Sequence, residues 1–184
     1  MGKVTGGMTI SLDGFVNDKN GSVAALYPDL GALADAEALQ EAMKATGAVV
    51  MGRHSYDMAN GDFTGYEYQV PIFVVTHDIP KKVAQGENGK LKFHFVTDGF
   101  ESAVKQAKSA AGDRDVTMIG GASAVQQCLK AGLIDELQIG VMPVLLGDGL
   151  RLFENLENAN IKLEKTKLIE SPAGRTDIYF RVVK

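Results

Sequence analysis

A short stretch at residues 49–58, VVMGRHSYDM, places an arginine, a histidine and a serine directly after an apolar run. Such a run is typical of a buried strand, and Gly52 ends it. If a helix begins at Arg53, its first backbone N–H groups have no partner within the helix and carry partial positive charge. A guanidinium and the Ser55 hydroxyl beside them favour phosphate. The alternative is a capped surface helix with a solvated arginine, and this stretch alone does not separate the two.

A second stretch, residues 116–125 (VTMIGGASAV), has the same organisation. An apolar run ends in Gly120 and Gly121, and small residues then open a predicted helix. The pattern is neither a dinucleotide-binding G-x-G-x-x-G nor a P-loop, so a plain turn is the alternative. In an open α/β sheet, the C-terminal ends of the strands form the ligand crevice. Two such strand ends together therefore predict a seat for the phosphates of a dinucleotide.

Three further places hold candidate residues, each with a structural alternative. Thr76 and His77 end a third apolar run and could contact an adenosine ribose or its 2′-phosphate, or lie in a surface loop. Asp13 ends the first predicted strand, where it either touches the substrate at the hinge of a mobile loop over the crevice or forms an Asp-Gly turn. Asp148 and Arg151 either line a pocket or form a solvated pair.

Strand and helix patterns alternate along the chain, which predicts one α/β domain over residues 1–184 with a mostly parallel sheet, helices on both faces and a C-terminal antiparallel hairpin. We expect Asp98 to cap a helix, with Glu101 completing a capping box. The expected strands are 4–12, 49–51, 71–76, 93–96, 116–119 and 136–142, the helices 32–45, 53–59, the segment from the Asp98 cap to residue 110, and 124–131, and the hairpin 161–169 with 176–183.

Composition narrows the classes of protein that the chain could represent. The 184 residues carry a formal net charge of −4, which argues against nucleic acid or an anionic membrane as a partner and leaves a small-molecule substrate. Cys128 is the only cysteine, so a Cys-based zinc site is excluded, and no metal is expected. Its thiol is predicted to be buried and to fill space in the core. The start of the chain lacks the apolar core of a signal peptide, and no apolar run reaches bilayer length, so a cytoplasmic protein is expected.

Five segments occur in an order and spacing that resemble the dihydrofolate reductase-like superfamily: MTISLDGFV, VVMGRHSYD, PIFVVTHD, VTMIGGASAVQQCL and PVLLGDGLRLF. More specifically, the chain resembles the branch named after the C-terminal reductase domain of bacterial riboflavin biosynthesis proteins. The resemblance implies a three-layer fold that binds NADPH, with Arg53 close to the 2′-phosphate and a Gly120–Gly121 peptide that is often cis. The implied cofactor contacts are Thr9, Val16, Gly52, Arg53, His54, Ser55, Thr76, His77, Gly120, Gly121, Ala122, Ser123 and Ala124, with Thr9 and Val16 beside the nicotinamide.

Departures from the superfamily pattern narrow the expected reaction. The chain has no tryptophan, and its acidic residues Asp29, Asp35 and Glu37 stand in no motif that matches the pterin-binding acid of dihydrofolate reductases. It also lacks the zinc deaminase signature of the bifunctional riboflavin proteins. The resemblance therefore implies an NADPH-dependent oxidoreductase that reduces a small heterocycle or carbonyl compound, such as a pyrimidine of the riboflavin-synthesis type, and disfavours dihydrofolate reduction.

Two alternatives stay open at this point. The first is a non-catalytic NADP(H)-binding sensor or scaffold that has the fold without turnover. The second concerns assembly: members of the family are commonly homodimers, and the apolar segment at residues 137–146 (LQIGVMPVLL) either faces a partner subunit or forms ordinary core strands.

Overall fold

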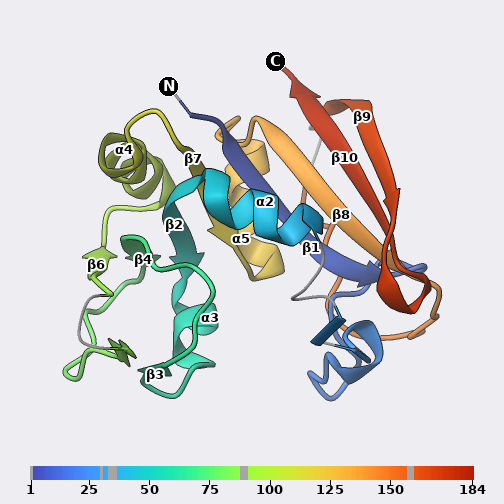
Figure 1. The fold of residues 1–184 in the computed structure, drawn as a ribbon, viewed down its shortest axis with the longest axis horizontal. Coiled ribbons are helices and arrows are strands. Elements are labelled where there is room, and N and C mark those ends of the chain that lie inside the picture. The colour runs from blue at the N-terminus through green and yellow to red at the C-terminus, as the bar shows by residue number, and fades with distance from the viewer. Residues whose placement is uncertain (1, 30, 33–36, 88–90, 157–159) are drawn as a thin grey trace.

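The computed structural model describes residues 2–29, 31–32, 37–87, 91–156 and 160–184. These residues form a single-domain α/β fold around one large twisted sheet (Figure 1). Its strand order is β6-β4-β2-β7-β1-β8-β10-β9. The strands are β1 (Val4–Ser11), β2 (Thr46–Gly52), β4 (Ile72–Val75), β6 (Phe93–Val96), β7 (Asp115–Ile119), β8 (Glu136–Met142), β9 (Lys162–Glu170) and β10 (Thr176–Val183).

The sheet is parallel from β6 through β8 and antiparallel where β10 joins β8 and β9 joins β10. The parallel strands bring their C-terminal ends to one edge of the sheet. In Figure 1 the chain leaves β2 into α3 on the lower side, and the connections after β1 and β8 lie at the lower right. A second, two-stranded sheet pairs β3 (Asp62–Phe63) with β5 (Gln85–Gly86). The predicted parallel sheet and C-terminal hairpin are confirmed.

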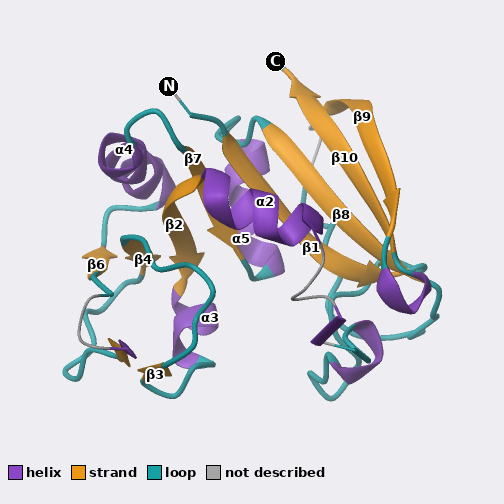
Figure 2. Cartoon of the chain, viewed as in Figure 1, coloured by secondary structure: helices purple, strands orange, loops and turns teal. Residues whose placement is uncertain are grey.

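Helices cover the two faces of the sheet (Figure 2). The helices are α2 (Glu37–Ala45), α3 (Arg53–Asp57), α4 (Phe100–Ala111) and α5 (Ala122–Lys130), with 3₁₀ turns η1 (Ala24–Leu26) and η3 (Pro172–Gly174). Buried residues of α4 and α5 share one core cluster with Val50, Val116 and Met118 of the central strands. The opposite face of β2, with Val49 and Met51, belongs to a second cluster rich in aromatic rings. Alternation along β2 thus feeds both cores, as expected for a strand covered on both sides.

Helix α2 differs from α4 and α5 because none of its residues is buried. It crosses in front of the central strands in Figure 1. Its apolar residues Ala38, Leu39 and Met43 instead line a cavity between the helix and the sheet. No described helix has the length and apolar character needed to cross a bilayer.

The structure corrects several local predictions. Helix α4 is preceded by Gly99 and has no side-chain cap, so the Asp98 capping box does not form. Helix α2 ends at Ala45 as predicted, and Gly47 lies inside β2, where an added Cβ would meet Ala111 at 2.9 Å. Residues 62–63, which lie in none of the strands predicted from the sequence, form β3. All described peptide bonds are trans, so the implied cis bond between Gly120 and Gly121 is wrong.

Candidate functional site

The two segments predicted to bind phosphate, residues 52–55 and 120–124, meet at the C-terminal edge of the sheet. The backbone N–H of Gly121, which follows β7, donates a hydrogen bond to the Ser55 hydroxyl of α3 at 3.1 Å. Gly120 has φ +48°, and an added Cβ there would lie 3.0 Å from the Ser55 oxygen. Gly52 precedes α3, and an added Cβ would meet only Ala124 of α5, at 3.9 Å. The predicted convergence of residues 52–55 with residues 120–124 is therefore present in the fold.

The start of α5 offers backbone rather than side chains to a ligand. Ala122 and Ala124 are buried in the protein, and Ser123 is exposed with its hydroxyl accepting a bond from Gln127 at 3.0 Å. A Cβ added at Gly121 would meet no atom within 4 Å, so open space lies beside this residue at the helix start. The first N–H groups of a nine-residue helix carry partial positive charge, which suits a phosphate group in that space.

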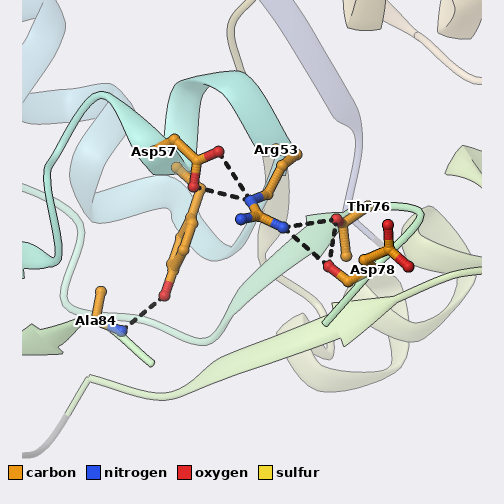
Figure 3. Close-up of polar contacts among 6 residues, drawn as sticks. Arg53, Asp57, Thr76, Asp78 and Ala84 are labelled. Carbon is orange, nitrogen blue, oxygen red and sulfur yellow. Dashed lines mark hydrogen bonds and ion pairs between the residues drawn. The ribbon is translucent and has the colours of Figure 1, made fainter. Parts of the chain in front are cut away.

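Arg53 lies between two strand ends (Figure 3). Its Nε donates to both oxygens of Asp57 at 2.8 and 2.9 Å, and its Nη1 donates to the Thr76 hydroxyl at 3.3 Å and the Asp78 carbonyl at 2.9 Å. Thr76 is buried and itself donates to the Asp78 carbonyl. The predicted 2′-phosphate residue and the predicted ribose residue therefore touch, although Asp57 occupies one side of the guanidinium.

The two histidines of the predicted cofactor site lie at the protein surface. His54 on α3 and His77 after β4 both have exposed side chains. Their side chains lie on the same edge of the sheet as Arg53, within solvent reach. Their contribution to cofactor binding stays a prediction.

The cavity under α2 is the larger of two neighbouring hollows, with a volume of about 600 Å³. Its floor comes from Thr5 to Thr9 of β1, residues 117–120, and residues 138 and 140 of β8. The smaller hollow, of about 290 Å³, lies between Met51, Ser55 and the segment at residues 62–67. The two hollows share Gly65, Glu67 and Ile119 in their walls, so they lie next to each other.

A buried polar group closes one end of the larger cavity. Arg175 and Asp177, at the start of β10, form an ion pair with an Nη2–Oδ1 distance of 2.8 Å. Arg175 also donates to the Thr9 hydroxyl at 3.3 Å, and Thr9 lines the same cavity. The contact of Thr9 with a nicotinamide ring stays a prediction. The sequence interpretation missed Arg175 and Asp177 because it treated the preceding SPAG as a hairpin turn. An acid and a base spaced by two in an otherwise apolar strand was the available signal, since such residues share one face.

Asp13 holds together two loops at the crevice edge. Its carboxylate accepts bonds from the Ser11 hydroxyl at 2.6 Å, from the Gly147 N–H at 2.8 Å and from the Leu146 N–H at 3.1 Å. The Ser11 bond, helped by the two backbone donors, lowers the pKa of Asp13 to about 2. Asp13 does not line either described hollow. These bonds favour a positioning role, and its contact with a substrate stays a prediction.

The remaining predicted residues belong to the two loops that Asp13 joins, the loop after β1 and the loop after β8. Val16 is buried in the main core and its N–H donates to the Leu150 carbonyl at 2.8 Å. Arg151 stacks over the Phe15 ring and donates to the Asp13 carbonyl, while Asp148 accepts a bond from the neighbouring Gly149 N–H. Neither Asp148 nor Arg151 lines the described hollows. Residues 12–17 of the loop after β1 are bonded to the loop after β8.

Two other candidates have simple outcomes. Cys128 is buried in the main core, and burial raises the pKa of its thiol to about 12, which confirms a packing position and opposes a reactive thiolate. Asp29 accepts a bond from the Ala32 N–H, and Asp35 lies outside the described residues.

A mostly parallel sheet with C-terminal antiparallel strands and a crevice at its carboxyl edge defines a dihydrofolate reductase-like α/β protein. The sequence profile described as "RibD C-terminal domain" matches residues 2–176, and the chain therefore belongs to that family. The Bacillus subtilis protein YyaP is 26% identical over 172 residues, covering 89% of this chain and 87% of YyaP.

Solved structures agree with this placement. The crystal structure of a putative riboflavin biosynthesis protein from Shewanella sp. PV-4 is 26% identical, with a TM-score of 0.82 over 99% of both chains. A Thermotoga maritima diaminohydroxyphosphoribosylaminopyrimidine deaminase/5-amino-6-(5-phosphoribosylamino)uracil reductase is 14% identical, with a TM-score of 0.70 over 99% of this chain and 57% of that one. Enterococcus faecalis dihydrofolate reductase, solved with NADP(H), is 12% identical, with a TM-score of 0.65 over 99% and 97%. The last two show likeness of fold.

Proposed function

We propose that the chain is an NADPH-dependent reductase of a small heterocyclic or carbonyl substrate of the pyrimidine type. One observation carries this proposal: the anion seat and the large cavity share a boundary. Gly120 lines the cavity, and its neighbour Gly121 donates to Ser55 at the seat. A dinucleotide whose phosphates occupy the seat would thus reach the cavity with its nicotinamide end. Family membership and the NADP(H) bound to the Enterococcus reductase support the same choice of cofactor.

The residues present fit such a cofactor. The open space beside Gly121 and the helix start suit a pyrophosphate, and the Ser55 hydroxyl stands next to it. Arg53 would meet the 2′-phosphate of NADPH, with Thr76 beside it. Bound NADPH supplies a hydride from its reduced nicotinamide ring.

The protein's own part is binding and orientation. The floor of β1 and the apolar side of α2 would hold a planar ring between them and shield its two faces from water. A proton needed for the reduction could come from solvent through the crevice, which remains open beside the exposed Glu67. No chain residue is assigned as the acid.

The test of the cofactor is a pair of matched variants at Arg53. Arg53→Ala removes a charged hydrogen bond to the 2′-phosphate, so NADPH affinity should fall about 10- to 100-fold while NADH affinity stays constant. Asp57→Asn removes the carboxylate that competes for the same guanidinium, so NADPH affinity should rise. Isothermal titration measures both. An Arg53→Ala protein that binds both coenzymes as the wild type does would remove Arg53 from this role.

The test of turnover follows nicotinamide absorbance with a panel of pyrimidines and carbonyl compounds. Oxidation of NADPH by at least one compound is expected. Tight NADPH binding without oxidation across the panel would instead favour a sensor or scaffold. Light scattering on the same preparation tests the predicted homodimer.

A further inference from the structure

A row of three residues runs across the sheet beneath the polar end of the cavity. Thr9 of β1 pairs with Gly140 of β8, and Gly140 pairs with Asp177 of β10. The Arg175 side chain lies over Gly140 and joins the two ends of this row, because it bonds both Asp177 and Thr9. A Cβ added at Gly140 would lie 3.0 Å from the Arg175 Nε and 3.1 Å from an Asp177 oxygen. Glycine at this position therefore leaves room for the ion pair inside the cavity wall.

The ion pair is buried, and the charges of Arg175 and Asp177 balance each other. The Arg175 and Asp177 side chains are 11% and 3% exposed. Asp177 accepts from the Arg175 Nε at 3.1 Å, from its Nη2 at 2.8 and 2.9 Å, and from the Ser171 hydroxyl. The acid therefore has its oxygens occupied. The guanidinium has five N–H groups, and its Nη1 carries one beyond the bond to Thr9, so a ligand acceptor can use this nitrogen.

The rest of the wall adds no positive charge. Among the described lining residues, the charged ones are Arg175, Asp177 and Glu67, which gives one guanidinium against two carboxylates and a net charge of −1. Residues 33–36, which precede α2 in sequence, contain no lysine or arginine. A phosphate dianion entering this cavity would be desolvated beside two carboxylates and would find its cation already paired.

We propose that this cavity takes an uncharged, unphosphorylated ring compound whose carbonyl oxygen accepts a hydrogen bond from Arg175. A neutral carbonyl needs one donor, which the Nη1 group supplies, and it does not need an unpaired cation. The rest of the ring packs against Met8, Met118 and the apolar side of α2. The inference rests on the proposed reductase function and narrows its substrate, since the name of the Thermotoga protein specifies a phosphoribosyl compound.

The test compares matched neutral and phosphorylated compounds by isothermal titration with the full chain saturated with NADP⁺. The pairs are 5-amino-6-ribosylaminouracil with 5-amino-6-(5-phosphoribosylamino)uracil, and uridine with uridine 5′-phosphate. The neutral member of each pair should bind at least about 10-fold more tightly, because the phosphate meets like charge. Equal or tighter binding of the phosphorylated members would overturn the inference, as would failure of both neutral members to bind.

Variants separate a specificity role from a structural one. Asp177→Asn leaves the Arg175 charge uncompensated, so the ratio of affinities should move at least about 10-fold toward the phosphorylated member. Glu67→Gln changes an exposed side chain, so the fold should be unaffected. It should move the ratio of affinities about 3-fold toward the phosphorylated member. An unchanged ratio in Glu67→Gln would overturn the charge argument.

The contact to the carbonyl has its own variant. Arg175→Lys keeps the charge beside Asp177 but loses the planar fork, so uridine affinity should fall about 10-fold and by more than NADP⁺ affinity. Unchanged uridine affinity would remove Arg175 from substrate recognition. Absence of NADP⁺ binding in the wild type, measured first, would refute the proposed reductase function instead.

Discussion

Two tyrosines of the aromatic core offer a matched test of how polar groups are satisfied in this protein. The Tyr56 hydroxyl accepts a hydrogen bond from the Ala84 backbone N–H at 2.7 Å, and both residues are buried. Figure 3 draws this bond at Ala84. The Tyr66 hydroxyl oxygen is also enclosed, but no group of the described residues bonds it. Both rings contact Phe63 in the same cluster. Removing each hydroxyl should therefore have opposite effects on stability.

The magnitudes follow from what each change leaves behind. Tyr56→Phe leaves the buried Ala84 N–H without an acceptor, which costs about 1–3 kcal/mol. Tyr66→Phe removes a hydroxyl that is buried without a partner, so the free energy of unfolding should stay constant or rise by about 1 kcal/mol. For a domain of this size, each kcal/mol shifts the melting temperature by about 2–4 °C. We expect Tyr56→Phe about 2–12 °C below the wild type, and Tyr66→Phe level with it or slightly above.

Thermal and urea unfolding of the wild type and the two variants measure these differences directly. A loss of stability in Tyr66→Phe as large as that in Tyr56→Phe would refute the reasoning, because it would mean that the Tyr66 hydroxyl has a stabilising partner. An unchanged melting temperature in Tyr56→Phe would equally refute the assigned role of the Ala84 bond.

Alkaline pH adds an independent readout for Tyr66. Burial raises the pKa of Tyr66 well above its usual value of 10.0. The unfolded chain then loses a proton above pH 10 that the folded chain keeps, so stability falls as pH rises past 10. Tyr66→Phe should remove up to about 1.4 kcal/mol per pH unit of that slope. Tyr68, whose pKa burial raises to about 12, keeps its own contribution in both proteins.

Two further predictions concern the two loops that Asp13 joins. Gly149→Ala would place a Cβ 2.0 Å from the Asn17 carbonyl oxygen at φ +141°, so this variant should destabilise the fold by about 2–5 kcal/mol. Gly147 has φ +75° and open space around it, so Gly147→Ala should cost only about 1–2 kcal/mol. Equal melting temperatures of the two variants would contradict the close contact at Gly149. The Asp13 carboxylate, whose pKa is lowered to about 2, stabilises the fold above pH 4, and this contribution is lost as pH falls toward 2. Acid unfolding of Asp13→Asn should therefore be less pH-dependent between pH 4 and 2 than that of the wild type, and identical profiles would contradict the Ser11 and backbone bonds as its cause.

The strand ends show how far sequence reasoning reaches in this fold. Apolar runs that stop at glycine predicted both anion seats, because the run and its stop are local features of the chain. The rule that parallel strands end at a common edge then predicted that residues 52–55 and 120–124 meet, which the Ser55–Gly121 bond confirms. The predicted Asp98 cap is wrong although its pattern is also local. The residue before α4 is Gly99, whose φ of +97° is a backbone conformation that favours glycine, and no side chain caps the helix.

Sequence alone determined the class of fold, the order of the main strands and helices without β3 and β5, and the glycine turns that follow β2 and β7, since these depend on residues close together in the chain. Only the tertiary structure decided what stands opposite those turns. Arg175 meets Thr9 because the register of β1, β8 and β10 brings them into one row, although 166 positions separate them. Likewise, α2 has an ordinary amphipathic pattern, and only packing shows that its apolar side lines a cavity, with Met43 also packed against the aromatic core cluster. Register and packing depend on many weak contacts between distant segments, and no local pattern in the chain records them.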